Sequence, residues 1–167
     1  CAPELLDKRL NNKENLEEQR YVVALSALMF VASFVVAGLN YRYGWHTLPD
    51  VVVWMSTVVF LIAYALYAEV MRENAHLSRT VEIQQGLRLV DSGLYGIVRH
   101  PMYTATVLLF LSMPLILGSI LSFVIMLVYI PLIALRIVSE ERLLKQGLPG
   151  YKEYTQRVKY RLIPYVW

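Results

Sequence analysis

Three long stretches of this chain carry no formal charge. Residues 21–41 and 51–68 are uncharged, and each run is about long enough to cross a hydrocarbon core of roughly 30 Å at about 1.5 Å per residue. A third uncharged run of 36 residues covers 100–135, counting His100 as neutral, and is too long for one ordinary span. Because 57% of the residues are hydrophobic, we predict an all-α integral membrane protein.

The third run contains residues that interrupt a helix. Pro114 and Gly118 are expected to supply a kink and a break, which divides the run into a helical hairpin of about 101–117 and 119–138. We therefore predict about four transmembrane helices in a single domain, 1–167. Its expected parts are a polar lead-in (1–20), two spans (21–70), a cytoplasmic loop (71–100), the helical hairpin (101–138) and cytoplasmic C-terminal helices (139–167), the last of them a short amphipathic helix over 151–160.

The positive charges indicate which side of the membrane each connection occupies. Lysine and arginine number four in residues 1–20, one in 40–50, four in 69–99 and seven from 136 onward. Cytoplasmic loops carry an excess of these residues. With four spans, fifteen of the 16 basic residues fall on one side. We therefore expect both ends of the chain to be cytoplasmic, and residues 86–103 to lie on the same face as the segment after 136.

Residues 86–103 combine polar, aromatic and helix-breaking residues directly before an uncharged run. Gly93 and Gly96 permit backbone conformations that other residues resist. Pro101 suits the first turn of a helix, so we predict that a helix begins at about 100–102. The free amides of that turn favour a polar ligand near Arg99 and His100. The alternative is a basic turn that only flanks the membrane.

Arg136 and Glu140 are four residues apart on the predicted fourth span and should share one helix face. They could form a simple ion pair at the membrane edge. However, Arg136 follows a long apolar run, and an ionisable group at such a depth is suspected of facing a cavity or a pathway. Glu141, about 100° further round the helix, could equally face solvent.

Several classes of protein lose support. The net charge of +3 is small and its basic residues are dispersed, which does not favour a nucleic-acid partner. The three histidines lack metal-ligand spacing, so no metal is expected, and the motifs of hydrolases, kinases and Rossmann dehydrogenases are absent. The single cysteine, Cys1, cannot form an internal disulfide. We interpret the start at Cys1 as trimming rather than acylation, because no lipidation signal is visible.

Three motifs follow one another on the predicted cytoplasmic side. They are Leu89-Val90-x-x-Gly93-x-Tyr95-x-x-x-Arg99-His100-Pro101-x-Tyr103, Arg136-x-x-x-Glu140-Glu141 and Tyr151-x-x-Tyr154. This ordered set resembles the isoprenylcysteine carboxyl methyltransferase family, whose broader superfamily includes the phospholipid N-methyltransferases. The likeness covers roughly 50–167 and is strongest over 86–154. The similar C-terminal tail of prokaryotic members suggests a prokaryotic inner or plasma membrane.

The resemblance implies an integral membrane enzyme that uses S-adenosyl-L-methionine without a Rossmann domain. The cofactor would lie between the cytoplasmic loop and the helix ends, and a lipid-like or small amphiphilic acceptor would enter from the bilayer. Arg136 would contact the acceptor, so the candidate catalytic residues are Arg136 and Arg99, the latter as organiser of the pocket. Cofactor-binding residues carried over from the motifs are Leu89, Val90, Tyr95, His100, Pro101, Met102, Tyr103 and Glu140.

The resemblance leaves the reaction open. The methyl group could pass to a carboxyl, an amine or a thiol, and the sequence names no convincing base for the last two. The same superfamily contains NADPH-dependent membrane reductases, although that reading calls for more basic residues to hold a 2′-phosphate. A third hypothesis is a helical scaffold without catalytic activity, whose polar loop binds a partner.

Overall fold

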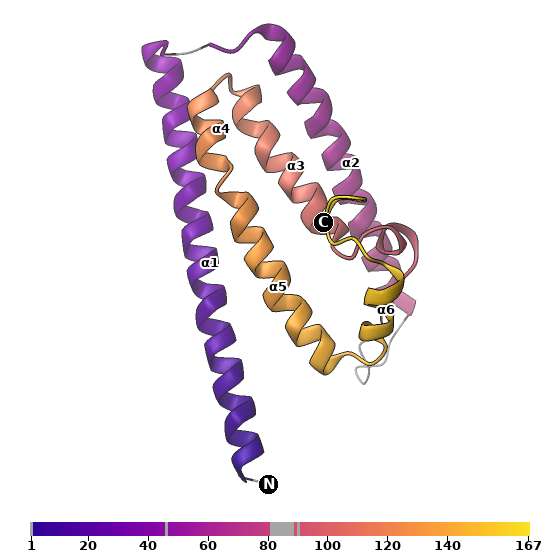
Figure 1. Ribbon diagram of the computed structural model, residues 1–167. Helices are drawn as coiled ribbons and strands as arrows, with labels where there is room; N and C mark the ends of the chain where they lie inside the picture. Colours follow the sequence, from indigo (N-terminus) through magenta and orange to yellow (C-terminus); the bar gives the residue numbers. More distant parts are fainter. Residues whose placement is uncertain (1, 46, 81–88, 90) are drawn as a thin grey trace.

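The computed structural model describes residues 2–45, 47–80, 89 and 91–167, with side chains for 21–45, 47–73, 89 and 91–167. The described residues form helices and no strand, which confirms the predicted all-α class (Figure 1). In chain order the elements are α1 (Ala2–Tyr43), α2 (Asp50–Thr80), the 3₁₀ helix η1 (Gly93–Gly96), α3 (Pro101–Ile116), α4 (Ile120–Met126), α5 (Tyr129–Gly147) and α6 (Tyr151–Arg157).

Three helical segments are long and apolar enough to cross a membrane: Tyr21–Tyr43, Asp50–Glu73 and Ile120–Gly147. The fourth predicted span, α3, is a shorter apolar helix of 16 residues, which corresponds to about 24 Å of length. The predicted polar lead-in is continuous with the first span, because α1 runs without interruption from Ala2 to Tyr43. An integral membrane protein with four apolar helical segments is the fold that the charge-free runs predict.

The connections of the bundle gather at two opposite ends. The α1–α2 and α3–α4 connections lie together at one end, whereas the turn between α5 and α6 and the start of α3 lie toward the other (Figure 1). Backbone hydrogen bonds join Arg99 N to Tyr160 O and His100 N to Arg161 O, both at 2.9 Å. The segment before α3 and the segment after α6 are therefore neighbours, as the charge distribution predicts.

The predicted break between α3 and α4 is confirmed, but the second arm of the hairpin is not one helix. Gly118 adopts a φ of +71°, and Ser119 caps α4 by accepting a hydrogen bond from Ser122 N. The expected helix over 119–138 is wrong at Leu127 and Val128, which separate α4 from α5. Pro131 has no N–H to donate to the Leu127 carbonyl, which accepts from Ile130 N at 3.1 Å instead.

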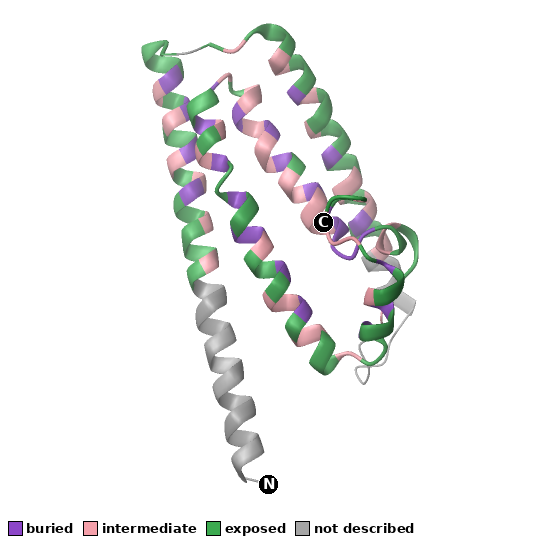
Figure 2. Cartoon of the chain, in the orientation of Figure 1, coloured by how far each residue is buried: buried purple, intermediate pink, exposed green. Residues whose placement is uncertain are grey.

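The core lies where α1, α3, α4 and α5 pack together. Phe110 of α3 makes edge-to-face contacts with Phe30 and Tyr129, at ring-centroid distances of 4.6 Å and 5.0 Å. Large apolar side chains on α1 and α2 point outward (Figure 2), which suits contact with lipid acyl chains rather than water. The buried core cluster comprises Met29, Met126, Tyr129, Leu132, Ile133, Ile137 and Leu162.

Candidate active site

The loop before α3 is attached to both α2 and α6. The Glu73 carboxylate of α2 accepts hydrogen bonds from Leu94 N, at 3.3 Å and 3.4 Å. From α6, Tyr154 donates its hydroxyl to the Tyr95 carbonyl at 2.7 Å, and Arg157 forms an ion pair with Asp91 at 2.7 Å. Burial raises the pKa of Tyr154 to about 12, so its hydroxyl stays protonated and remains a donor. These contacts attach the loop that carries Tyr95 to α2 and α6.

Replacing Gly93 with alanine is expected to loosen this loop. Gly93 has a φ of +58°, and a Cβ there would take the place of the Glu73 carboxylate. The carboxylate can swing away, so the cost is strained backbone plus the lost bond to Leu94 N, about 1–3 kcal/mol together. The matched control is Gly118→Ala, because Gly118 also has a positive φ, +71°, with nothing within 4 Å of a Cβ.

Thermal unfolding in detergent compares the two glycine variants. We expect Gly93→Ala to lower the melting temperature more than Gly118→Ala does, and to weaken ligand binding because Tyr95 is carried by the loop. Equal effects on both properties would show that the Glu73 contact does not restrain the loop.

Pro101 begins α3, with His100 as its N-cap residue, so the predicted helix start is confirmed. Pro101 needs no hydrogen-bond acceptor for its nitrogen at this position. The same turn is joined to the C-terminal segment, since Thr104 donates its hydroxyl to the Leu162 carbonyl at 2.7 Å. The chain therefore places Arg99 and His100 at the junction between the loop, α3 and the C-terminal segment.

Glu141 is the buried carboxylate at which the charged groups of that junction meet. The expectation that it could equally face solvent is wrong. It is 2% exposed, and its carboxylate accepts from Arg99 Nε at 2.7 Å and from Arg161 Nε at 3.2 Å. His100 Nε2 lies 3.4 Å from the same carboxylate, and Lys145 Nζ lies at 3.9 Å. Its position on α5 turns it inward, where it neutralises the buried Arg99.

The Arg99 side chain also supports the backbone of the C-terminal segment. Its Nη1 donates to the carbonyls of Val158 and Lys159, at 2.7 Å and 3.0 Å. Arg99 is 8% exposed, and these bonds with the Glu141 pair fix the orientation of its guanidinium. The geometry matches the predicted role of Arg99 as organiser of the pocket, a role that stays a prediction.

Arg136, Tyr103 and Glu140 form a chain of hydrogen bonds from α5 to α3 and back. Arg136 Nε donates to the Tyr103 hydroxyl at 2.9 Å, which donates to Glu140 Oε2 at 2.7 Å. The Arg136 guanidinium carbon also lies 5.7 Å from the centre of the Tyr103 ring. Arg136 and Glu140 therefore share a helix face, as predicted, but they are bridged by Tyr103 rather than directly paired.

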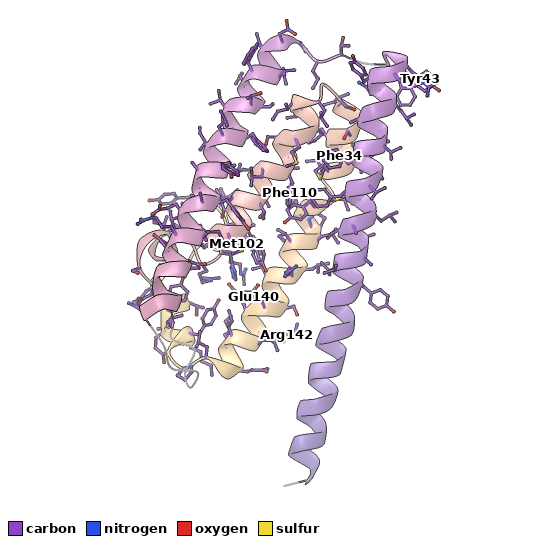
Figure 3. The ribbon with its side chains drawn as sticks, turned by 180° about the vertical axis from the view of Figure 1, so that it is seen from behind. Phe34, Tyr43, Met102, Phe110, Glu140 and Arg142 are labelled. Atoms are coloured by element: carbon purple, nitrogen blue, oxygen red, sulfur yellow. The ribbon has the colours of Figure 1, made fainter. Side chains whose placement is uncertain are left out.

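A cavity of about 250 Å³ lies between the loop, α3, α5 and α6. Met102 of α3 and Glu140 of α5, labelled in Figure 3, lie toward the same end of the bundle and both line this cavity. Aromatic, aliphatic and carboxylate side chains are combined in its walls. Six residues predicted to bind a cofactor contribute to it: Leu89, Tyr95, His100, Met102, Tyr103 and Glu140.

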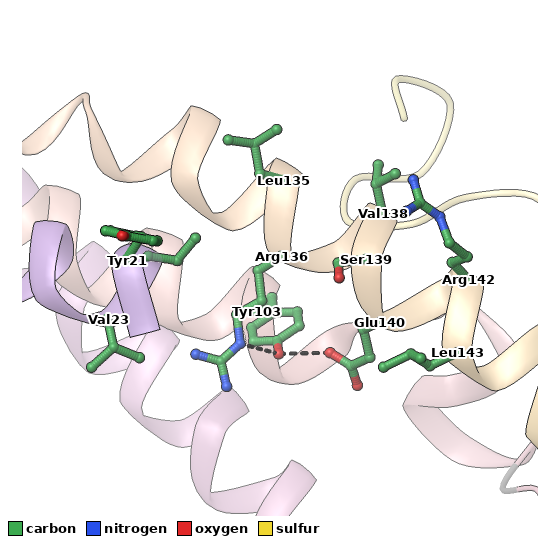
Figure 4. A pocket seen from close by; sticks show the side chains of 11 residues that line it. Tyr21, Val23, Tyr103, Leu135, Arg136, Val138, Ser139, Glu140, Arg142 and Leu143 are labelled. Carbon is green, nitrogen blue, oxygen red and sulfur yellow. Dashed lines mark hydrogen bonds between the residues drawn. The ribbon is translucent and has the colours of Figure 1, made fainter. Parts of the chain in front are cut away.

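A second cavity, of about 590 Å³, lies between α1, α3 and α5 (Figure 4). Tyr21 and Val23 of α1 line one side, and residues of α5 from Leu135 to Leu143 line the other. Arg136 lines this cavity and is not in the wall of the smaller one. The two cavities meet at Tyr103 and Glu140, which line both.

Two predicted cofactor-binding residues are not placed in the cavity wall. Pro101 is buried and starts the helix that carries Met102 and Tyr103, without lining the cavity itself. Val90 lies outside the described residues. Within the part of the chain that the structure describes, no group of three or more His, Cys, Asp or Glu side chains could hold a metal ion.

The smaller cavity also has walls that were not predicted. They are Leu144 and Leu148 near the end of α5, and Tyr151 and Tyr154 of α6. The spacing of the two tyrosines placed them one helical turn apart, but no feature of the sequence placed that turn against the loop. Tyr151 and Tyr154 are 3% and 1% exposed, whereas the residues between them are exposed, so α6 is amphipathic as predicted and its buried face forms part of the wall. The helix ends at Arg157 rather than at 160.

The fold is that of an integral membrane protein with two adjoining cavities between its helices. A sequence profile of the isoprenylcysteine carboxyl methyltransferase (ICMT) family matches residues 53–146. This match covers more than half of the chain and includes Tyr95, His100, Tyr103, Arg136 and Glu140. The chain belongs to the isoprenylcysteine carboxyl methyltransferase family.

Part of the chain is also similar to a reductase. The chain is 36% identical over 92 residues to the Delta(14)-sterol reductase TM7SF2 of Mus musculus. That alignment covers 53% of this chain and 22% of the reductase. The chain therefore spans only about a fifth of the length of this curated relative, and the likeness is to one part of it.

Proposed function

We propose that this protein transfers a methyl group from S-adenosyl-L-methionine to a carboxyl, amine or thiol group of a lipid-like or small amphiphilic acceptor. Family membership supports a membrane methyltransferase. The observation that carries the proposal is the pair of cavities that share Tyr103 and Glu140. A donor in one cavity and an acceptor in the other would meet at a single wall.

The residues of the smaller cavity fit the methyl donor. Aromatic faces such as those of Tyr95 and Tyr103 attract a sulfonium cation, and the Glu140 carboxylate can accept hydrogen bonds from a ribose or an ammonium group. Leu89, Leu144 and other aliphatic walls offer apolar area to a base. When bound, the donor supplies an electrophilic methyl group.

The acceptor would lie in the larger cavity, against Arg136. Arg136 Nη1 and Nη2 make no hydrogen bond to a described residue, whereas Nε is held by Tyr103. A guanidinium presented in this way can bind a carboxylate through two parallel hydrogen bonds. Arg142 lines the same cavity, so its charge further favours an anionic acceptor, which needs no base because it is already ionised.

Positioning is then the main contribution of the protein. Methyl transfer requires the acceptor atom, the methyl carbon and the sulfur in line, and fixing reactants in a reactive geometry can supply much of a rate enhancement. Tyr103 is held between Arg136 and Glu140 at 2.9 Å and 2.7 Å. Its ring would therefore keep a constant position at the boundary where the two ligands meet.

The similar segment of the sterol reductase supports a second candidate, an NADPH-dependent membrane reductase. A 2′-phosphate is usually held by arginine or lysine side chains. Among the described walls of the smaller cavity, Arg99 is the basic side chain besides His100, and its guanidinium is already bonded to Glu141 and two carbonyls. The methyltransferase is the better-supported proposal.

Ligand-dependent thermal stability tests the proposal. We expect S-adenosylhomocysteine to raise the melting temperature of the protein in detergent, because a ligand that binds only the folded state must stabilise it, by about 2.7 kcal/mol at 100 times its dissociation constant. NADPH serves as the comparison. A shift with NADPH and none with millimolar S-adenosylhomocysteine would favour the reductase, and no shift with either would favour a scaffold without a cofactor.

We further propose that the site lies at the cytoplasmic face and that both ends of the chain are on that side. At the opposite end of the bundle from the site, the sequence between α1 and α2 (44–49) has no lysine or arginine, and the last turn of α1 has one, Arg42. Cytoplasmic segments carry the excess of lysine and arginine. Labelling of a cysteine introduced at Gly44 by an impermeant reagent in intact cells, with no labelling at Lys152→Cys, is the expected result.

A further inference from the structure

Residues 162–167 form a turn whose two ends are packed into the core of the helical bundle. After α6 the chain turns back toward the start of α3 (Figure 1). Leu162 is 8% exposed and belongs to the buried core cluster, against which Trp167 also packs. The other buried members of this cluster lie on the apolar helices α1, α4 and α5: Met29, Met126, Tyr129, Leu132, Ile133 and Ile137.

The contact with α3 places this turn at the membrane boundary. Thr104 of α3 donates its hydroxyl to the Leu162 carbonyl at 2.7 Å, so the turn begins beside the first helical turn of α3. That helix has 16 residues and is about 24 Å long, less than the roughly 30 Å of a hydrocarbon core. A helix shorter than the layer that it crosses ends within the layer or at its edge, and the turn lies beside that end.

The side chains at the tip of the turn are apolar and point outward. Ile163, Tyr165 and Val166 are 51%, 88% and 75% exposed, and residues 162–167 carry no charge. Large apolar side chains gathered on one short exposed turn indicate an interaction surface. The Tyr165 ring packs against Tyr160 at 5.2 Å between centroids, and tyrosine is enriched at the boundary between lipid and water.

The backbone of the turn is hydrogen-bonded internally. The amides of Arg161, Leu162 and Ile163 donate to the Trp167 carbonyl at 2.8, 2.9 and 3.2 Å. In return, the amides of Val166 and Trp167 donate to the Ile163 carbonyl at 3.1 and 3.2 Å. The proline of the turn has no N–H to satisfy. Backbone groups that enter lipid must find partners within the protein, and these bonds supply them.

We infer that the turn 162–167 inserts into the bilayer interface, with Ile163 and Val166 against acyl chains and Tyr165 at the level of the headgroups. The partner is membrane lipid because the turn lies beside helices whose own outward side chains are apolar (Figure 2). The segment that carries the turn accepts hydrogen bonds from Arg99 N and His100 N, so insertion also ties this junction to the membrane. The inference does not depend on the proposed reaction.

Spin labels on the turn test its insertion in lipid nanodiscs. In a Cys1→Ser background, which removes the single cysteine of the sequence, the labels are attached at Ile163→Cys and Val166→Cys. Molecular oxygen concentrates in lipid, whereas a nickel chelate stays in water. We expect the ratio of oxygen to nickel collisions at both positions to be severalfold higher than at Lys152→Cys, an exposed position of α6. Ile62→Cys, on the outward face of α2 at 61% exposed, is the reference for lipid contact.

Two results of the labelling would overturn the inference. Nickel collisions at Ile163→Cys and Val166→Cys as frequent as at Lys152→Cys would show that the turn lies in water. Few collisions with either reagent would show that protein covers the turn, either a second copy of this chain or a partner.

Val166→Asp gives an independent readout. An ionised side chain is disfavoured in lipid, so we expect this variant to lower the melting temperature in lipid nanodiscs by several degrees. Lys152→Asp is the control on a water-exposed surface, where substitutions have little effect, and should leave the melting temperature nearly unchanged. A melting temperature of Val166→Asp equal to that of the wild type would contradict insertion of the turn.

Discussion

Replacing Glu141 with alanine is expected to destabilise the folded protein by about 3–5 kcal/mol, because removing one partner of a buried ion pair leaves the other charge uncompensated. Arg99, whose side chain is 7% exposed, is the charge left behind. The variant would also remove the acceptor of Arg161 Nε, while the Arg99 bonds to the carbonyls of Val158 and Lys159 could still form. Chemical unfolding in detergent, or the yield of folded protein, measures the loss.

Glu140→Ala is the matched control for Glu141→Ala, because the two carboxylates are adjacent in sequence. Glu140 is partly exposed and accepts one hydrogen bond from a described donor, the Tyr103 hydroxyl. We therefore expect Glu140→Ala to fold with little loss of stability and to abolish stabilisation by S-adenosylhomocysteine. Comparable stabilities of the two variants would contradict the assignment of Glu141 as the structural anchor.

The stability lost when a partner of Glu141 is replaced by alanine should be larger the more deeply that partner is buried. Arg99→Ala leaves the carboxylate buried with weaker compensation and removes the bonds to Val158 and Lys159. The Arg161 side chain is 29% exposed and the Lys145 side chain 43% exposed, so the loss of either should cost less, because solvent screens exposed pairs. A larger effect of Lys145→Ala than of Arg99→Ala would contradict this order.

Arg136→Ala is expected to remove methyl transfer while leaving the methyl donor bound. Arg136 lines the larger cavity and not the smaller one, so its loss should change the dissociation constant for S-adenosylhomocysteine by less than about threefold. Turnover should fall by about 10²–10³, the usual effect of removing one preorganised charged donor. Single-turnover transfer of a labelled methyl group to a lipid extract, beside calorimetry with S-adenosylhomocysteine, separates the two quantities.

Two further substitutions control the Arg136 experiment. Arg136→Lys keeps the positive charge but loses the planar guanidinium with its two parallel donors. We therefore expect its turnover to recover at most part of the loss seen in Arg136→Ala. Arg142→Ala removes a cation from the same cavity without touching Tyr103, and should raise KM for an anionic acceptor more than it lowers kcat. Loss of S-adenosylhomocysteine binding in Arg136→Ala would show that Arg136 serves the donor rather than the acceptor.

Much of the architecture follows from local properties of the chain. The uncharged runs predicted the spans because only a helix satisfies its own backbone within a membrane, and Pro101 predicted the start of α3 because proline fits the first helical turn. The four-residue spacing predicted that Arg136 and Glu140 share a face. Each of these features depends on residues within one continuous segment of the chain, so it can be derived from the sequence alone.

The rest was decided by tertiary contacts. Periodicity gives the angle between Glu140 and Glu141 around α5 but not the rotation of that helix against its neighbours, so only packing against Arg99 and Arg161 made Glu141 the buried anchor. The same holds for Tyr151, which lines the smaller cavity only because α6 packs at the same end of the bundle as the loop and α3. A sequence determines which groups are available, whereas burial, pairing and shared cavity walls arise between segments far apart in the chain.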